Sequence, residues 1–334
     1  MLTSSAVSNT MRTSTSSAAA IIPRPIAALA VLAVCALTAN LAAAQGNAVV
    51  RQSPDDAWWT GPMLANSAAT LPRGHFLIEP YLYDVHAARS NSYGTRSYIL
   101  YGLANRLTVG GIPIAAFNTV SGASSSSRVG LCDPTVLAQV RLVQFHEGSW
   151  IPTMSIMVQE GLPTAKYDRL GNRPSDGFGS GSHTTTIGLN TQRNFWLRNG
   201  RILRMRLNLS EALSSPVTVE DVSVYGTGPG FRGRANPGTS FFADAAGEYS
   251  LTKRWVLALD VTRGHDGNTR VTGSDAQTPN VLLNSGSRDA FGFAPAVEYS
   301  WKPTLGVLLG ARVIVAGHGT AATFTPALAI NFVR

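Results

Sequence analysis

The sequence predicts an all-β protein: a single transmembrane, antiparallel, up-and-down β-barrel of about 12 strands, with short periplasmic turns and long extracellular loops. Three observations support this fold class. Only 14% of the 334 residues are charged although 44% are hydrophobic, whereas soluble domains carry about 25% charged residues. Beyond residue 44, no apolar run is long enough to form a membrane-spanning helix. From residue 74 onward, segments of about ten residues alternate between apolar and polar side chains.

The first 44 residues are expected to be a secretory signal peptide. Arg12 and Arg24 are its only charges, an apolar core runs from Ile26 to Leu37, and small residues for cleavage lie at Ala42 to Ala44. Cys35 would also allow a lipoprotein, but apolar residues continue past it, which favours the ordinary signal peptide. Removal of the peptide would leave a net charge of +6, and the basic residues that remain are scattered along the chain. Such scattering does not indicate a nucleic-acid partner.

Two parts are expected in the mature chain. Residues 45–73 have no strand period and are interpreted as a periplasmic lead-in or a small plug. Residues 74–334 are predicted to form the barrel. The mature part holds a single cysteine, Cys132, which excludes an internal disulfide.

Alternation assigns the two faces of the predicted wall. In residues 254–263, Trp255 and Leu259 share one face while Asp260 lies on the other. In residues 202–210, Arg204 and Arg206 alternate with leucine and methionine. Charged side chains that face lipid are costly, whereas a lumen tolerates them. We therefore expect the apolar set to face lipid and the charged set to face the lumen.

The same pattern places twelve strands along the chain. They cover residues 74–86, 93–103, 106–118, 130–145, 151–162, 182–195, 201–212, 238–251, 254–264, 288–301, 304–316 and 321–333. An even number returns the C-terminus to the side of the N-terminus, so both are expected in the periplasm and the barrel in the outer membrane of a Gram-negative cell, in contact with its lipid.

The connections between these strands separate by length. Short connections fall at one end, and the long ones, at 119–129, 163–181, 213–237 and 265–287, fall at the other. An additional pair of short strands within 217–225 is an alternative. The glycine-rich stretch Gly226–Gly230 is interpreted as part of a long loop that could gate the mouth, because it lacks the Lys-Ser/Thr ending of a phosphate-binding loop.

Inward-facing charged residues form the candidate functional site. They are Arg96, Arg141, Arg204, Arg206, Asp244, Glu248, Asp260, Glu298 and Arg312, with Glu79 and Gln139 on the same face. A charged constriction would select solutes by field and size. Alternatively, an internal salt-bridge network would brace a nearly filled barrel. The sequence leaves both alternatives open.

Two outward-facing sets complete the predicted wall. Four tryptophans beside the predicted periplasmic turns would form an interfacial aromatic girdle: Trp150, Trp196, Trp255 and Trp301. The last strand places Phe324, Leu328, Ile330 and Phe332 on one face. This pattern is similar to the C-terminal signal read by the barrel-assembly machinery, which is therefore an expected partner during insertion.

Several stretches carry a family resemblance. They are Asp56–Pro62, Gly74–Tyr81, Leu162–Thr164, Val224–Thr227, Pro237–Thr239, Glu248–Leu251 with Trp255–Leu257, and Pro295–Trp301. In this order they resemble the outer-membrane transporters grouped as the MetA-pathway-of-phenol-degradation family, over nearly the whole mature chain. The resemblance implies a barrel that lets small, often aromatic or hydrophobic, molecules pass passively, and it implies no catalytic residues.

Three classes of function remain after these observations: a passive channel, a structural or surface-interaction barrel with a plugged lumen, and an outer-membrane hydrolase. A barrel hydrolase needs Ser, His and an Asn or Asp that orient one another. The histidines after the signal peptide lie in or beside turns and loops, or, for His75, at the start of the first strand. They also lack metal-ligand spacing. We therefore expect a channel without enzymatic activity, metal or cofactor, whose solute the sequence does not name.

Overall fold

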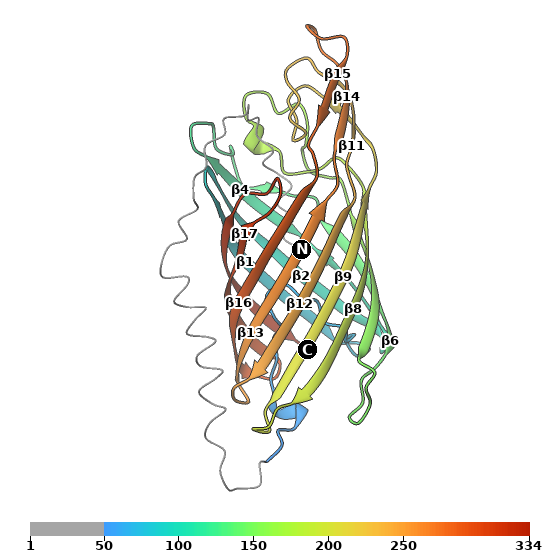
Figure 1. Ribbon diagram of the computed structural model, residues 1–334, viewed down its shortest axis with the longest axis vertical. Helices are drawn as coiled ribbons and strands as arrows, with labels where there is room; N and C mark the ends of the chain where they lie inside the picture. The colour runs from blue at the N-terminus through green and yellow to red at the C-terminus, as the bar shows by residue number, and fades with distance from the viewer. Residues whose placement is uncertain (1–49) are drawn as a thin grey trace.

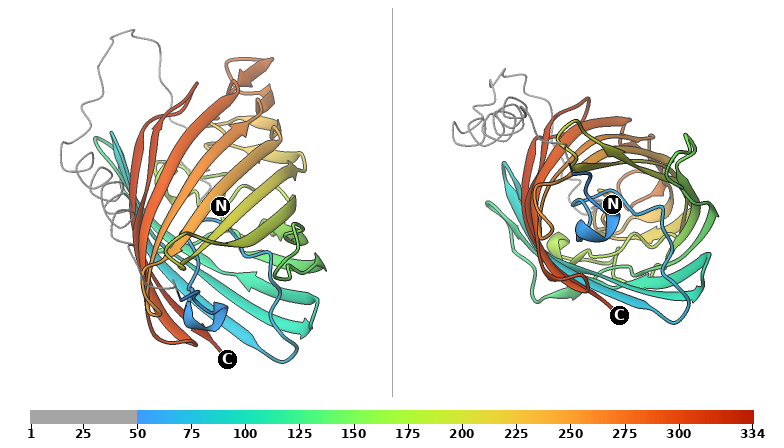
Figure 2. Two further views of the ribbon diagram at one scale, coloured as in Figure 1. Left: turned by 60° about the horizontal axis from the view of Figure 1, so that its bottom comes forward. Right: turned by 90° about the horizontal axis from the view of Figure 1, so that it is seen from below.

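The computed structural model describes residues 50–334, so the expected signal peptide at 1–44 lies outside the described residues. Antiparallel strands form one closed barrel (Figures 1 and 2). Closure is made by β1 (Phe76–Ala87), which pairs with β2 (Ser90–Ala104) on one side and with β18 (Thr323–Val333) on the other. The prediction of a closed, antiparallel, all-β barrel is confirmed.

The wall contains twelve crossing strands, as predicted. Besides β1, β2 and β18 they are β3 with β4 (Leu107–Ile112 and Ile114–Val120), β5 with β6 (Gly130–Leu131 and Thr135–Val143), β7 (Thr153–Gly161), β8 (Thr184–Trp196), β9 (Ile202–Ser214), β12 (Ser240–Ser250), β13 (Trp255–Asp266), β16 (Arg288–Lys302) and β17 (Leu305–Ala316). The helical content of residues 50–334 is two 3-10 turns, η1 (Pro54–Asp56) and η2 (Pro174–Asp176). Within the same residues, no helix is long and apolar enough to cross a membrane.

Prolines interrupt two of the crossing strands. Pro113 separates β3 from β4, and Pro134 precedes β6 after a break that follows β5. Proline has no N–H to give to a ladder, which accounts for the breaks at these two positions, whereas Pro80, Pro295 and Pro326 lie within the unbroken strands β1, β16 and β18. The sequence prediction merged each pair into one strand, and the structure keeps the crossing but divides the hydrogen-bonded ladder.

Alternation along each strand separates a lipid-facing surface from an inner one. On the outer surface, Leu82, Ile99 and Leu309 are exposed, as lipid-facing side chains of an isolated barrel must be. On the inner surface, Val256 and Ala294 are fully buried. At these positions the inner surface is packed and does not line an open lumen.

A second, four-stranded sheet rises above the end of the barrel where the long loops lie (Figure 1). It consists of β10 (Val217–Glu220), β11 (Arg232–Asn236), β14 (Arg270–Ser274) and β15 (Val281–Asn284). These strands continue β9, β12, β13 and β16 in the same order. Residues 213–237 and 265–287 were expected to be loops, and this expectation was wrong. The alternative of short strands within 217–225 holds for β10 only, because its partner β11 begins at residue 232.

Candidate functional site

The site lies inside the barrel at the end with the tight turns, where the wall meets residues 50–73, called here the N-terminal segment. Viewed from that end, the segment lies within the ring of strands (Figure 2). It has no regular structure apart from η1, so its backbone N–H groups need partners other than a strand ladder. Side chains on the inner face of the wall provide them.

Glu298, on β16, binds the first part of the segment. Its Oε2 accepts hydrogen bonds from the Thr60 N–H at 2.7 Å, the Thr60 hydroxyl at 2.9 Å and the Gly61 N–H at 3.2 Å. Gly61 has a φ of +116°, a conformation that favours glycine. The carboxylate is fully buried, so these donors replace the water that it loses.

Asp260, on the neighbouring strand β13, binds the next turn of the segment. Its two oxygens accept from the backbone N–H groups of Met63 at 3.1 Å, Leu64 at 3.4 Å and Ala65 at 3.0 Å. Three consecutive donors on one carboxylate fix the local path of the chain. The Met63 side chain is buried at the same point against inward-facing residues of the wall.

A buried charge cluster lies on β9 and β12. Arg204 faces Glu248 directly across the strand pair and forms a two-point contact with it, with Nε at 2.6 Å from Oε2 and Nη2 on Oε1. Arg206 adds an ion pair to the same Oε2 at 2.9 Å. The cluster is also tied to the N-terminal segment, because Arg206 Nη1 donates to the Ala65 carbonyl at 2.8 Å and Arg204 lies 4.4 Å above the Trp59 ring.

Uncharged side chains hold the last part of the segment. Gln192 on β8 accepts from the Ser67 hydroxyl and the Ala68 N–H, both at 3.0 Å. Gln139 on β6 donates to the Ser67 carbonyl at 2.9 Å. Sequence reasoning placed Gln139 in the lumen but missed Gln192, although its inward face follows from the same alternation that places Asn190 inside.

The remaining candidates do not join this cluster. Asp244 on β12 is buried, with no hydrogen bond to its two oxygens within residues 50–334, and it lies in the field of Arg312 and Arg206. Arg312 on β17 lies 5.8 Å from the Phe242 ring. Arg96 is buried on β2, 5.6 Å from the Tyr98 ring.

Glu79, on β1, also faces the interior. Its Oε1 accepts a hydrogen bond from Asn331 Nδ2 on β18 at 3.1 Å. The contact lies across the strand pair that closes the barrel, so this carboxylate links the two closing strands.

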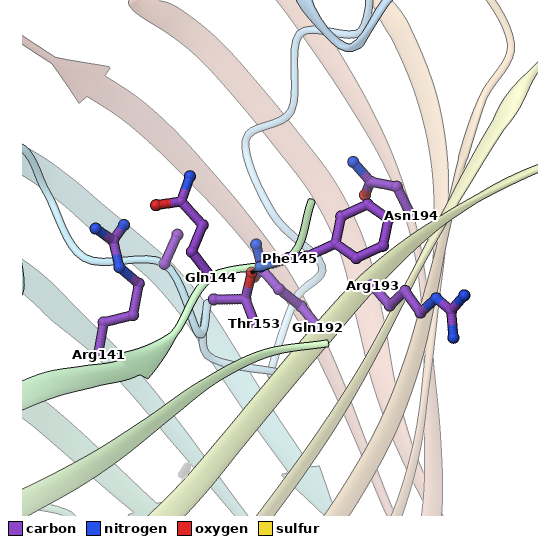
Figure 3. A pocket seen from close by; sticks show the side chains of 8 residues that line it. Arg141, Gln144, Phe145, Thr153, Gln192, Arg193 and Asn194 are labelled. Atoms are coloured by element: carbon purple, nitrogen blue, oxygen red, sulfur yellow. Dashed lines mark hydrogen bonds between the residues drawn. The ribbon is translucent and has the colours of Figure 1, made fainter. Parts of the chain in front are cut away.

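Arg141 lines a small cavity beside the N-terminal segment (Figure 3). The cavity measures about 160 Å³ and lies between Ala69 and the ends of β6, β7 and β8. Gln144, Gln192 and Asn194 give it a polar lining, whereas the neighbouring Arg193 side chain is turned away from them. Arg141 also donates to the Asn105 carbonyl at 3.1 Å, so it belongs to the rim of the barrel rather than to the charge cluster.

Three of the four girdle tryptophans have exposed side chains near the tight turns. Trp255 and Trp301 are exposed on either side of Tyr299, with ring centroids 4.6 Å and 5.3 Å from it, and Trp150 is exposed in a turn. Trp196 departs from the prediction. Its Nε1 donates to the Gln52 carbonyl at 2.9 Å beneath the Arg51 guanidinium, because even-numbered positions of β8 face inward.

The final strand presents its apolar set outward. Leu328, Ile330 and Phe332 are exposed on β18, while Phe324 is half-buried and lies beside His86. Phe332 also contacts Phe76 with ring centroids 5.7 Å apart. As for metals, residues 50–334 contain no group of three or more His, Cys, Asp or Glu side chains that could hold an ion.

The fold and the lumen define an outer-membrane β-barrel whose interior binds its own N-terminal segment. Residues 61–325 match the family described as "Putative MetA-pathway of phenol degradation", and the chain belongs to this family. The resemblance seen in the sequence is thereby confirmed. No curated protein matches the chain.

Solved structures with the same fold include a crystal structure of the COG4313 outer membrane channel from Pseudomonas putida F1. It is 15% identical, with a TM-score of 0.60 over 81% of this chain and 100% of that chain. The NanC porin is 10% identical with a TM-score of 0.44, over 76% of this chain and 98% of that chain. The KdgM porin crystallised with disordered oligogalacturonate is 7% identical with a TM-score of 0.41, over 77% and 98%. The last two scores are too low to support an inference.

Proposed function

We propose that this chain is an outer-membrane channel through which small molecules pass passively, with aromatic or hydrophobic compounds as the candidate solutes. The observation that carries the proposal is a closed wall whose inner face is polar and is occupied, at one end, by a separate segment of the same chain. A wall that only anchored the protein would need no such interior. Both termini are proposed to be periplasmic.

Family membership and one related fold support the proposal. The Pseudomonas putida F1 protein is described as an outer membrane channel, and its whole length is covered by the likeness. Transfer of this role to the present chain is part of the proposal, as is the choice of solute. The further proposed partners are outer-membrane lipid and, during insertion, the barrel-assembly machinery.

The N-terminal segment, rather than the charged residues alone, is proposed as the constriction. Glu298, Asp260 and Arg206 are buried, and each forms hydrogen bonds with backbone groups of the segment. A buried, paired charge offers little field to a passing solute. The burial of these charges favours the interpretation that they brace the barrel. The cavity lined by Arg141 is proposed as the gap beside the segment through which a solute leaves.

A second candidate is a structural or surface-interaction barrel with a plugged lumen. It is favoured by one observation, the number of separate wall strands that bind the segment: β16, β13, β9, β8 and β6 each contribute a side chain. A segment held at so many points could seal the lumen permanently.

Conductance in planar bilayers, together with solute uptake into proteoliposomes, separates the two candidates. The mature protein is compared with a variant that lacks residues 50–70, and with a control that lacks residues 276–280 of the exposed loop between β14 and β15. If the protein is a channel, the mature protein should conduct, and the variant without residues 50–70 should conduct more. The mature protein should also admit a small aromatic solute faster than a sugar of equal size. If the full chain and the loop control neither conduct nor admit solute, and only the segment deletion does, the barrel is plugged and the channel proposal fails.

A further inference from the structure

The four-stranded sheet above the barrel has two chemically different faces. Val217, Val219, Ala235 and Val271 form one face and are buried with Phe231 in an apolar cluster. The opposite face carries Arg232 and Arg234 on β11 and Arg270 on β14, all three exposed. A short sheet that needs only one covered face for stability leaves the other free to bind a ligand.

The three arginines are close neighbours on that face. Arg232 and Arg234 are two residues apart on one strand, and Arg270 lies opposite Asn236, which makes it a diagonal neighbour of Arg234. Such neighbours have Cα atoms about 7–8 Å apart. Within residues 50–334 none of the three forms an ion pair. Glu220, which pairs with Arg232 across β10 and β11, is already bound by Arg169 at 2.9 Å.

The arginine face is turned away from the mouth of the barrel. Asn118, on the inner face of β4, donates to the Ser175 carbonyl at 3.0 Å, which places the loop 163–181 inside the mouth. Gly177 of this loop packs against Val224, part of the 221–231 stretch that covers the apolar face. The view along the barrel also shows η2 within the ring of strands (Figure 2). The apolar face is therefore directed to the mouth and the arginine face to the outside.

A fourth arginine lies lower on the same outer side. Arg263 is on β13, on the lipid-facing side together with Trp255, Leu259 and Val261, and it is exposed. Its position is eight residues beyond Trp255 along the strand. At about 3.3 Å per residue and a tilt of about 40°, this corresponds to roughly 20 Å of height. Because the apolar band of such barrels is about 25 Å tall, the Arg263 backbone lies about 5 Å below its upper edge, a distance that an extended arginine side chain covers to bring its guanidinium to the headgroups opposite the tryptophans.

A shallow groove surrounds Arg263. It measures about 340 Å³ and is lined by Arg263, Asp289, Ala290, Phe291 and Gly317. Phe291 is exposed and offers an apolar wall, while Asp289 is 3.1 Å from His265 Nδ1. The groove thus combines a guanidinium without an ion pair in the described chain with a surface suited to an acyl chain.

We propose that Arg263 and the arginine face of the upper sheet together form a binding site for lipopolysaccharide of the outer leaflet. This rests on the orientation given under the proposed function. Guanidinium groups bind phosphate through paired, charge-assisted hydrogen bonds. Lipopolysaccharide carries phosphates at two heights, on its lipid headgroup and on its sugar core, and the arginines lie at two corresponding heights on one side of the barrel. A free phosphate ion would match only one level.

Binding is tested by native mass spectrometry and by titration of the detergent-purified barrel. The probes are lipopolysaccharide with a phosphorylated core, the same lipopolysaccharide without its core phosphates but with its headgroup phosphates, phosphatidylglycerol and inorganic phosphate. The variants are Arg263→Gln and the triple change Arg232→Gln, Arg234→Gln and Arg270→Gln. Arg193→Gln is the matched control, an outward-facing arginine near the tight turns, where it donates to the Trp150 carbonyl at 2.8 Å. Heat-modified mobility on gels establishes that each variant folds.

The triple variant is expected to lose at least about tenfold in affinity for phosphorylated lipopolysaccharide, since the loss of even one charge-assisted contact to phosphate costs on the order of a decade. Arg263→Gln is expected to weaken both the phosphorylated and the core-dephosphorylated probe, and Arg193→Gln neither. The proposal is overturned if the triple variant binds like the parent protein, or if inorganic phosphate or phosphatidylglycerol binds equally well. Bilayer conductance is measured in parallel, and a conducting triple variant separates failure of this site from failure of the channel.

Discussion

At the scale of single residues, the decisive feature of the lumen is the buried charge cluster on β9 and β12. Glu248 is fully buried and compensates two guanidinium groups, those of Arg204 and Arg206. Formation of such a cluster gains little net stability, because desolvation offsets the Coulomb attraction. Removal of one member is costly, since the remaining charges stay buried without a partner.

Glu248→Ala is therefore expected to lower the free energy of unfolding by about 3–5 kcal/mol. The measurement is urea unfolding of the barrel in lipid vesicles, followed by tryptophan fluorescence. The matched control is Glu211→Ala on the outer face of β9, which should change the value by no more than about 0.5 kcal/mol. Equal effects of the two changes would show that Glu248 is hydrated, and the bracing interpretation would then be lost.

Removal of the cations tests what the cluster does for a solute. Arg204→Ala and Arg206→Ala are both expected to destabilise the barrel while leaving ion selectivity unchanged, because neither guanidinium is exposed to a passing ion. Selectivity is read from reversal potentials in planar bilayers across a salt gradient. A shift of the reversal potential towards cations in either variant would restore the charged-constriction alternative.

At the scale of elements, the N-terminal segment depends on a few wall carboxylates for its position. Asp260 accepts three backbone N–H groups, and its ionised form has only acceptors. An asparagine at this position would keep one acceptor oxygen and turn an NH₂ group towards N–H donors. The segment should then detach locally while the wall, whose ladder is unaffected, stays folded.

Asp260→Asn is accordingly expected to increase the rates of hydrogen exchange and protease cleavage at residues 57–70 roughly tenfold. This corresponds to a loss of about 1.4 kcal/mol in the free energy of local opening. Channel conductance should rise with it. The control is Asp266→Asn on the same strand, where the exposed carboxylate accepts the Ser240 hydroxyl at 2.7 Å and no second hydrogen bond from residues 50–334. Unchanged exchange in the 57–70 stretch would mean that Glu298 and Gln192 hold the segment without Asp260.

The elements also differ in how far the sequence could predict them. The wall follows from alternation, because lipid on one face and a packed interior on the other impose a two-residue period on every crossing strand. The path of the N-terminal segment does not, since its contacts with Glu298 and Asp260 join residues about two hundred positions apart and leave no local pattern. The prediction for Trp196 rested on its position beside a turn, whereas the alternation along β8 directs its side chain inward.

The strands of the upper sheet could not be predicted from the sequence either. Strands β11 and β14 are rich in glycine and arginine, which is typical of loops. Their apolar face is completed by Phe231 and by Tyr167 of a distant loop. Strands whose core is supplied by other segments cannot be recognised from their own composition.

At the scale of the whole molecule, the two ends of the barrel differ in construction, and the proposed orientation rests on this difference. The end with tight turns also holds the N-terminal segment, with Lys253 of one turn bonded to Asp56 at 2.8 Å. The other end carries the long loops and the upper sheet. Bacterial barrels place short turns in the periplasm and long loops outside the cell, so the upper sheet should be accessible on intact cells.

Single-cysteine labelling tests this orientation. In a Cys132→Ser background, the expected signal peptide contains the other cysteine of the sequence, so an introduced cysteine is the only thiol of the mature protein. Ala276→Cys, in the exposed connection between β14 and β15, should react with a membrane-impermeant maleimide on intact cells. Arg198→Cys, in the tight turn between β8 and β9, should react only after the outer membrane is permeabilised. Labelling of both in detergent controls for thiol reactivity, and the reverse pattern on intact cells would invert the barrel and remove the basis for the lipopolysaccharide site.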